Sequence, residues 1–284
     1  MLSRVLAIAF LLACLPAAAE EPARPHTAGP SVRVFVPPLR MPQLGFARQL
    51  RVYLPPDYAK GTKRYPVLYM FDGQNLFDDA TSYAGEWGVD ETMDALARDQ
   101  GFQAIVVGID HGNELRFNEL IPYPNVRFLP NVGGAFVDDV VNVVKPFVDA
   151  NYRTLSGREQ TAIVGSSLGG LSADYTLHRY SQVFSKAGVF SPSYWVSNEP
   201  FAVATRAPLP AGSRVYLYMG GREGDESVAM LEKMATILRT QPDKVAVTVH
   251  LAPEAEHNEK AWRAEFPRAV RWLFDLPEQA SGAH

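Results

Sequence analysis

The chain has 284 residues, of which 47% are hydrophobic and 20% are charged. This balance is typical of a globular protein with a substantial core, and the length fits one large domain or two smaller ones. The formal net charge is -4 and the sequence holds no block of basic residues, which argues against nucleic acid as a partner.

The first residues are typical of a secretory signal peptide. Arg4 gives a positive start, and residues 5–13 form an apolar stretch that is too short to span a bilayer. A proline and three alanines follow, which suits cleavage after Ala19. We therefore expect residues 1–19 to be a signal peptide and the mature protein to be exported, periplasmic or secreted, with no stable membrane insertion. A retained membrane anchor is the alternative.

The single cysteine, Cys14, lies inside this leader. Lipidation at Cys14 is a minor option, because Leu12 stands where a lipoprotein signal has a small residue. Residues 20–30 are rich in proline and alanine and are expected to form a loose linker. The folded domain is expected over residues 31–278, with a disordered tail at 279–284.

Two segments without a helix between them, 31–37 and 45–54, are the first strand candidates. Residues 48–54 alternate polar and apolar side chains, as a half-exposed antiparallel edge strand does. Continuous apolar runs at 67–71 and 104–109 then indicate buried central strands. A helix is expected between them, over 89–97.

Apolar residues recur at three- and four-residue steps from 136 to 148, which predicts an amphipathic helix that Pro146 bends or ends. Strands are then expected at 161–164, 186–190, 215–219 and 245–251. Helices are expected after the turn at 165–169, with Leu171, Tyr175 and His178 on one face, over 228–238 and over 262–273.

From residue 67 onward, predicted strands alternate with helices. This pattern predicts an α/β fold with a mainly parallel sheet and helices on both faces. Eight strands in this order match the α/β-hydrolase layout, an eight-stranded, mostly parallel sheet. Functional residues gather at the carboxyl ends of the strands in such sheets.

The strand at 161–164 leads into Gly165-Ser166-Ser167-Leu168-Gly169 and then into a helix. This is the strand, turn and helix of a Gly-x-Ser-x-Gly nucleophile turn. The glycines are needed because the chain passes itself so closely that a Cβ would collide. Only Ser167 has a glycine two residues away on both sides, so Ser167 is the candidate nucleophile. The pentapeptide alone is a weak signal, and the flanking elements strengthen it.

A serine nucleophile needs a histidine base and an acid that orients it, and in this fold the chain order is Ser, acid, His. His257 follows the last strand and is the histidine in the expected position; an unremarkable loop histidine is the alternative. The other five histidines lie near the chain ends, before Ser167, or inside a helix or strand: His26, His111, His178, His250 and His284.

The acid is expected in the loop 220–226, which follows the strand 215–219. Glu223 comes first and Asp225 is the second choice, while Glu226 suits the start of the next helix. A solvated loop charge is the alternative for each of them. Two N–H groups must stabilise the oxyanion, and we expect those of Leu168, at a helix N-terminus, and Gln74, in the turn after 67–71.

Several stretches together resemble the esterase D-like branch of the α/β-hydrolases: residues 71–78, 85–87, 165–170, 191–195 and His257-Asn258-Glu259-x-x-Trp262. That branch holds carboxylesterases, feruloyl and acetylxylan esterases, siderophore-lactone esterases and mycolyltransferases. The resemblance implies Ser167 as nucleophile, His257 as base, and Leu168 and Gln74 as oxyanion donors. Glu223 matches a Gly-x-x-Glu loop of the siderophore-esterase-like members, although the acid varies within the branch.

Aromatic residues in the matching stretches are candidates for the substrate pocket: Phe77, Trp87, Tyr194 and Trp195. Trp87 and Trp195 are the expected substrate-binding residues, and a place in the core is the alternative for each aromatic side chain. Arg116 and Glu119 follow the strand 104–109. They are expected either to bind polar groups of the substrate or to pair with each other.

The sequence therefore predicts an exported serine esterase that acts on a small-molecule ester, with no metal and no cofactor. A siderophore-lactone esterase and an acyltransferase of the same fold are alternatives, and a non-catalytic binding protein is a third. The sequence specifies neither the natural ester nor the oligomeric state.

Overall fold

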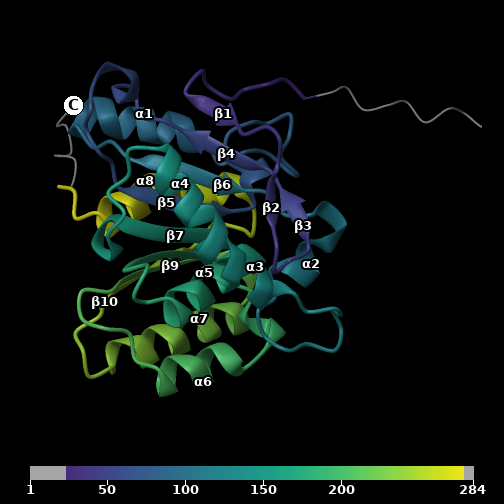
Figure 1. The fold of residues 1–284 in the computed structure, drawn as a ribbon. Helices are drawn as coiled ribbons and strands as arrows, with labels where there is room; N and C mark the ends of the chain where they lie inside the picture. The colour runs from purple at the N-terminus through teal and green to yellow at the C-terminus, as the bar shows by residue number, and fades with distance from the viewer. Residues whose placement is uncertain (1–23, 278–284) are drawn as a thin grey trace, which may run out of the picture.

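The computed structural model of the protein describes residues 24–277, which are built around one eight-stranded sheet (Figure 1). The strand order is β1-β4-β6-β5-β7-β8-β9-β10. The strands are β1 (Val32–Val34), β4 (Leu50–Tyr53), β5 (Val67–Phe71), β6 (Ile105–Ile109), β7 (Thr161–Ser166), β8 (Lys186–Phe190), β9 (Arg214–Gly220) and β10 (Ala246–Ala252). β4 is antiparallel to both of its neighbours, β1 and β6. The remaining strands, β6, β5, β7, β8, β9 and β10 in sheet order, are parallel to one another. The predicted α/β fold class is confirmed.

The predicted strand over 45–54 is wrong as a single element. It divides at Gln49 into β3 (Phe46–Arg48) and β4. β3 pairs with β2 (Leu39–Met41) in a separate two-stranded sheet, while β4 joins the large sheet. The alternation of polar and apolar residues describes both pieces equally well, because it does not identify the partner strand.

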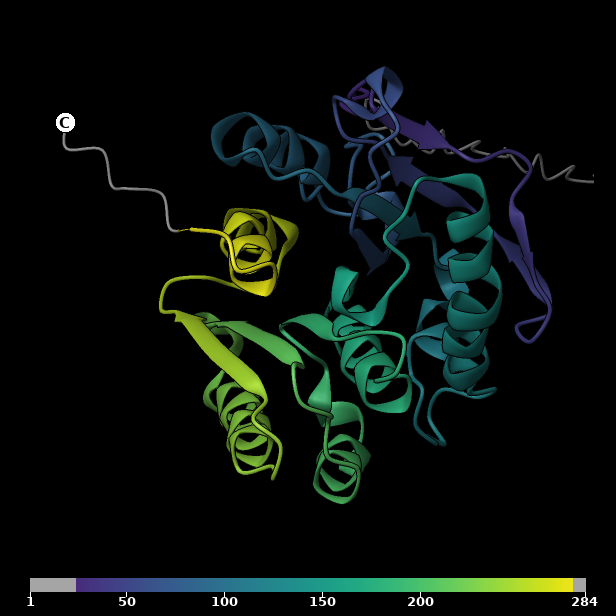
Figure 2. The same cartoon turned by 60° about the vertical axis from the view of Figure 1, so that its left-hand side comes forward.

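Helices cover both faces of the sheet (Figure 2). On one face, α1 (Val89–Gln100) packs with α8 (Glu259–Leu273). The other face carries α3 (Gly133–Asp139), α4 (Lys145–Asn151), α5 (Leu168–Arg179) and α7 (Asp225–Arg239), with α6 (Glu199–Arg206) against α7. Each face has its own hydrophobic cluster, which explains why every residue of β5 and β6 is buried.

The helix predicted over 136–148 continues through Pro146. α3 passes into a π-helical stretch (Val140–Val144), and α4 follows with Pro146 as its second residue. Proline has no N–H and its ring crowds the preceding turn, and a wider turn accommodates both. Pro146 therefore changes the local winding without ending the helix.

Residues 24–30 are held against the domain, so the expectation of a loose linker is wrong for them. Thr27 N donates to Asp78 Oδ1 (3.1 Å), and His26 Nδ1 lies 2.8 Å from Asp78 Oδ2. Gly29 N donates to Asp90 Oδ2 (2.7 Å). The carboxylates of Asp78 and Asp90 thus accept hydrogen bonds from backbone N–H groups of a segment that has few apolar side chains to bury.

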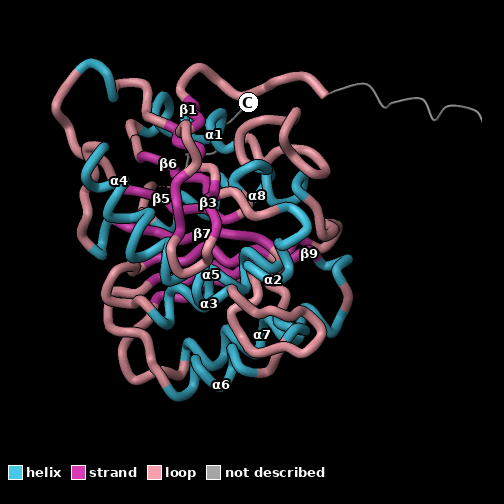
Figure 3. Tube along the Cα trace, turned by 45° about the vertical axis from the view of Figure 1, so that its right-hand side comes forward, coloured by secondary structure: helices cyan, strands magenta, loops and turns pink. Residues whose placement is uncertain are grey.

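The expected signal peptide and tail lie outside the described residues. Within 24–277, no helix has both the length and the apolar character that crossing a membrane requires. Figure 3 shows the strands side by side through the centre, with helices and loops around them. Because β5 to β10 are parallel, the loops that follow them meet at one edge of the sheet, where the predicted site residues lie.

Candidate active site

Ser167 lies in the turn between β7 and α5 in a strained backbone conformation. Its φ is 57° and its ψ is -121°, a combination that side-chain-bearing residues rarely adopt. Three backbone hydrogen bonds hold this turn: Ser167 N to Phe190 O (2.9 Å), Leu171 N to Ser167 O (3.1 Å) and Ser193 N to Ser167 O (3.0 Å). The turn therefore presents the Ser167 side chain at the tip of the strand.

The glycine on the strand side of this turn has a steric cause. A Cβ on Gly165 would overlap the carbonyl oxygen of Gly169. The predicted close approach of the two chain segments is thus confirmed, and it fixes where α5 starts relative to β7.

His257 and Glu223 come together from the loops that follow β10 and β9. His257 Nδ1 lies 2.6 Å from Glu223 Oε2. The Glu223 carboxylate is buried, while the imidazole is about half exposed. Asp225, the second candidate for the acid, is exposed at the start of α7. The structure therefore brings Glu223, and not Asp225, to the histidine.

The other carboxylate oxygen of Glu223 has two further donors. Gly220 N donates to Oε1 (2.8 Å), and so does Ser191 Oγ (2.6 Å). Trp262 Nε1 donates in turn to Ser191 Oγ (2.9 Å). Burial opposes the charge on Glu223, but the hydrogen bonds from His257, Ser191 and Gly220 hold the pKa of this carboxyl below its usual range.

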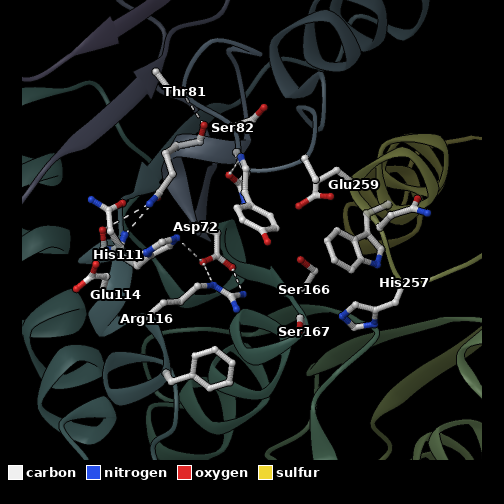
Figure 4. A pocket seen from close by; sticks show the side chains of 18 residues that line it. Asp72, Thr81, Ser82, His111, Glu114, Arg116, Ser166, Ser167, His257 and Glu259 are labelled. Atoms are coloured by element: carbon white, nitrogen blue, oxygen red, sulfur yellow. Dashed lines mark hydrogen bonds and ion pairs between the residues drawn. The ribbon is translucent and has the colours of Figure 1, made fainter. Parts of the chain in front are cut away.

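Ser167 and His257 line the same cavity of about 860 Å³. Figure 4 shows the imidazole beside the serine, facing the same space. The Ser167 hydroxyl lies 3.3 Å from Ser193 Oγ, and among residues 24–277 no hydrogen bond joins it to His257. Such contacts are often long in substrate-free enzymes and shorten when substrate binds.

The N–H groups of Leu168 and Gln74 have no hydrogen-bond acceptor within the described part of the chain. Leu168 starts α5, and Gln74 lies in the turn after β5 and lines the cavity. Asp72 begins that turn with a φ of 58°. Both N–H groups thus remain available to an incoming oxyanion.

The Asp72 turn is fixed by Arg116. Arg116 Nε and Nη2 donate to the two Asp72 carboxylate oxygens at 2.7 and 2.8 Å. Burial opposes the charge on Asp72, but Arg116 and His111 keep the pKa of its carboxyl below the usual range. Glu119 instead pairs with Arg48, so of the two alternatives given for Arg116 and Glu119, their mutual pair is not formed. The two side chains leave α2 (Arg116–Glu119) toward different partners.

The expected aromatic pocket residues separate into core and surface. Trp87 is 2% exposed and packs against Phe190, Trp262 and Phe266, so it lies in the core and not in the cavity wall. Phe77 and Tyr194 are buried as well. The expectation that Trp87 binds substrate is therefore wrong, because helix packing over the sheet encloses it.

Trp195 is 55% exposed and lines a second cavity of about 260 Å³. Glu223 and His257 also line this cavity, and His257 lines the larger cavity with Ser167 as well. Ser191 and Ser193 contact Glu223 and Ser167, and neither serine was predicted as a site residue. Both lie in the stretch 191–195, from which only the aromatic residues Tyr194 and Trp195 were considered as site candidates.

One group of acidic residues among those described has metal-ligand spacing: Glu86, Asp90 and Glu91. These residues line neither of the cavities that contain His257. Arg263 pairs with Glu86 (3.3 Å) and Glu91 (3.8 Å), so a cation of the chain itself already balances part of their charge.

Comparisons with known proteins agree with this fold. The chain is 26% identical over 242 residues to "Uncharacterized protein YbbA" of Bacillus subtilis (strain 168), which covers 80% of this chain and 92% of that protein. The BES protein from Bacillus cereus has a TM-score of 0.71 at 20% identity, over 88% of this chain and 97% of that one. An IroE-like serine hydrolase from Shewanella oneidensis has a TM-score of 0.70 at 18% identity, over 86% and 79%. At these identities the two structures show the fold alone.

Membership of a family rests on a separate finding. The profile of the family described as "Putative esterase" matches residues 42–273, which is most of the chain and includes both loops that hold His257 and Glu223. The resemblance to an esterase branch of the α/β-hydrolases is therefore confirmed. The chain belongs to this esterase family, and its class of reaction is the hydrolysis of esters.

Proposed function

We propose that this esterase is exported and uses Ser167, His257 and Glu223 to hydrolyse small carboxylic esters through an acyl-enzyme. The observation that carries the proposal is the meeting of three chain segments at one edge of the sheet. The His257–Glu223 contact of 2.6 Å borders the cavity into which the strained turn directs Ser167. This is the spatial order of nucleophile, base and orienting acid.

In the first half of the reaction, Ser167 Oγ attacks the ester carbonyl carbon while Nε2 of His257 takes the hydroxyl proton. The hydroxyl exchanges its contact with Ser193 for one with the imidazole. Glu223 holds Nδ1 and stabilises the imidazolium, and its carboxylate stays charged because its hydrogen bonds lower its pKa. The imidazolium then donates its proton to the departing alkoxide, which leaves as the alcohol.

The tetrahedral intermediate carries a negative oxygen. The N–H groups of Leu168 and Gln74 donate to it, and Arg116 keeps the Gln74 turn in place through Asp72. Loss of one such donor typically costs about 3–4 kcal/mol of transition-state stabilisation. Water, activated by the same imidazole, then releases the acid and restores Ser167.

Labelling by a fluorophosphonate probe, followed by turnover of a p-nitrophenyl ester, tests the nucleophile. The Ser167→Ala variant should take up no probe and lose roughly a factor of 10⁶ in kcat. The neighbouring Ser166→Ala variant is the matched control and should still be labelled. Labelling of Ser167→Ala at the wild-type level would show that the nucleophile is another residue.

Export is the part of the proposal that rests on the sequence of residues 1–19 alone. Expression of the full chain in a bacterium, followed by fractionation and intact-mass measurement, tests it. We expect the protein in the periplasm or the medium with Glu20 as its first residue. A cytoplasmic protein that keeps residues 1–19 would contradict export without affecting the proposed chemistry.

A further inference from the structure

A buried carboxylate faces the cavity and has no assigned role. Glu259, the first residue of α8, is 7% exposed and lines the cavity with Ser167 and His257. Within residues 24–277, no other residue donates a hydrogen bond to its carboxylate and no cation lies within ion-pair distance of it. Figure 4 shows the carboxylate directed into the cavity, on the same side as His257 and across from Arg116.

The start of α8 explains how the fold tolerates this charge. Asn258 caps the helix by accepting a hydrogen bond from Ala261 N (3.0 Å), and the positive end of the helix dipole favours a carboxylate at the next position. Burial still raises the pKa of the Glu259 carboxyl, and Asp72 adds to this, while Arg116 and His257 act in the opposite direction. The carboxylate is therefore held in place with much of its hydrogen-bonding capacity unused.

The remaining charges of the cavity wall do not compensate Glu259. Arg116 donates to both oxygens of Asp72, so that pair is close to neutral. Burial lowers the pKa of His111, which favours its neutral form. Glu114 adds a second negative charge, at an exposed position. The cavity wall therefore carries a net negative charge, and Glu259 holds the buried share of that charge.

A buried acceptor of this kind gains most from a positive or hydrogen-bond-donating group, and it repels an anion. Its position indicates which part of the substrate it meets. In the proposed reaction His257 donates a proton to the departing alcohol, and Glu259 follows His257 by two residues on the same cavity wall. The alcohol part of the ester therefore lies next to Glu259.

We infer that Glu259 forms an alcohol-binding subsite that selects esters whose alcohol part carries a hydroxyl or ammonium group and rejects those that carry a carboxylate. This inference rests on the proposed function, because that function places the leaving alcohol beside His257. It narrows the substrate class from esters in general to acyl esters of polyhydroxylated or cationic alcohols.

Matched acetate esters test the subsite, with kcat/KM measured by acetate release. Glycerol monoacetate is compared with butyl acetate, and acetylcholine with its uncharged isostere in which carbon replaces nitrogen. The acetate ester of a hydroxy carboxylic acid of similar length is the anionic member. We expect the wild-type enzyme to favour a hydroxylated or cationic ester over its apolar match by about tenfold or more, and to turn over the anionic ester least.

The Glu259→Gln variant keeps the size of the side chain and loses its charge. We expect it to lose most of the preference for the cationic or hydroxylated ester and to accept the anionic ester better. The substrate pair whose kcat/KM ratio changes in the variant shows whether Glu259 binds the ammonium group or the hydroxyl group. Glu256→Gln, an exposed acid three residues earlier, is the matched control and should keep the wild-type ratios.

Ratios between two substrates in one preparation do not depend on the fraction of folded enzyme, so reduced stability of Glu259→Gln cannot imitate the result. Equal ratios in the wild type and in Glu259→Gln would overturn the subsite while leaving the esterase intact. Acetate release that survives Ser167→Ala across the whole panel would overturn the proposed function itself.

Discussion

The Nδ1 atom of His257 lies 2.6 Å from Oε2 of Glu223, although the two residues are 34 positions apart in the chain. A backbone N–H and a hydroxyl donate to the other oxygen of Glu223, so this carboxylate is fixed before any substrate binds. Such preorganisation holds the imidazole in one orientation and one tautomer. The pair is therefore the part of the site where a small chemical change should have a large effect.

Replacement of Glu223 by glutamine should lower kcat by about 10⁴-fold with little change in the fold. The amide keeps the shape, but it removes the charge that stabilises the imidazolium and favours the wrong tautomer of His257, as in serine proteases whose triad aspartate becomes asparagine. Steady-state turnover of a p-nitrophenyl ester measures this loss. Asp225→Asn is the matched control, since Asp225 is exposed, and it should stay within a few-fold of the wild type. A large loss in Asp225→Asn with a small one in Glu223→Gln would reverse the assignment.

The Gly165→Ala substitution should destabilise the protein, while Gly134→Ala should not. In Gly165→Ala the new methyl group would overlap the Gly169 carbonyl, and separating the two segments costs roughly 1–3 kcal/mol. Gly134 lies in α3, and in Gly134→Ala the nearest atom would be Tyr175 Oη of α5 at 3.6 Å, which is an ordinary contact. We expect that variant to be as stable as the wild type or up to about 1 kcal/mol more stable.

Urea unfolding monitored by circular dichroism measures both free energies. Equal stability of the two variants would mean that the backbone around Gly165 and Gly169 can move apart at little cost in free energy, which would contradict this prediction. The esterase rate of Gly165→Ala should also fall, because the turn that positions Ser167 moves with the displaced segment.

Asp174, buried in α5, should make stability depend on pH. Burial raises the pKa of Asp174 to about 7, from 3.8. The folded state therefore binds the proton more tightly than the unfolded state. Its contribution to stability is fully present below about pH 4 and is lost as the pH rises through about 7.

The Asp174→Asn variant cannot titrate at this position. The difference in free energy of unfolding between wild type and variant should therefore fall by on the order of 3 kcal/mol between about pH 4 and pH 8. Burial also raises the pKa of Asp90 to about 7, but Asp90 is present in both proteins and cancels in the difference. Parallel stability curves across this range would show that Asp174 keeps its ordinary titration in the folded protein.

Much of the fold was predictable because it follows from short-range patterns. Short unbroken apolar runs such as 67–71 are typical of strands buried on both faces, and they occur as predicted at β5 and β6. The turn at Ser167 was predictable for a similar reason, since a Cβ on Gly165 would meet the Gly169 carbonyl within the same five residues. The edge strands were harder, because the partner of β3 is another short segment and not the main sheet.

The sequence by itself determined the alternation of strands and helices, the nucleophile turn and the position of His257 after the last strand, because each of these depends on neighbouring residues. Only the tertiary structure decided that Glu223 meets His257 while Asp225 faces solvent, that Arg116 holds Asp72, and that Trp87 is enclosed in the core. These outcomes depend on which loops and helices approach one another at one edge of the sheet. The direction of a loop side chain is set by the distant segment that packs against it. A pattern of neighbouring residues in the sequence contains no information about that contact.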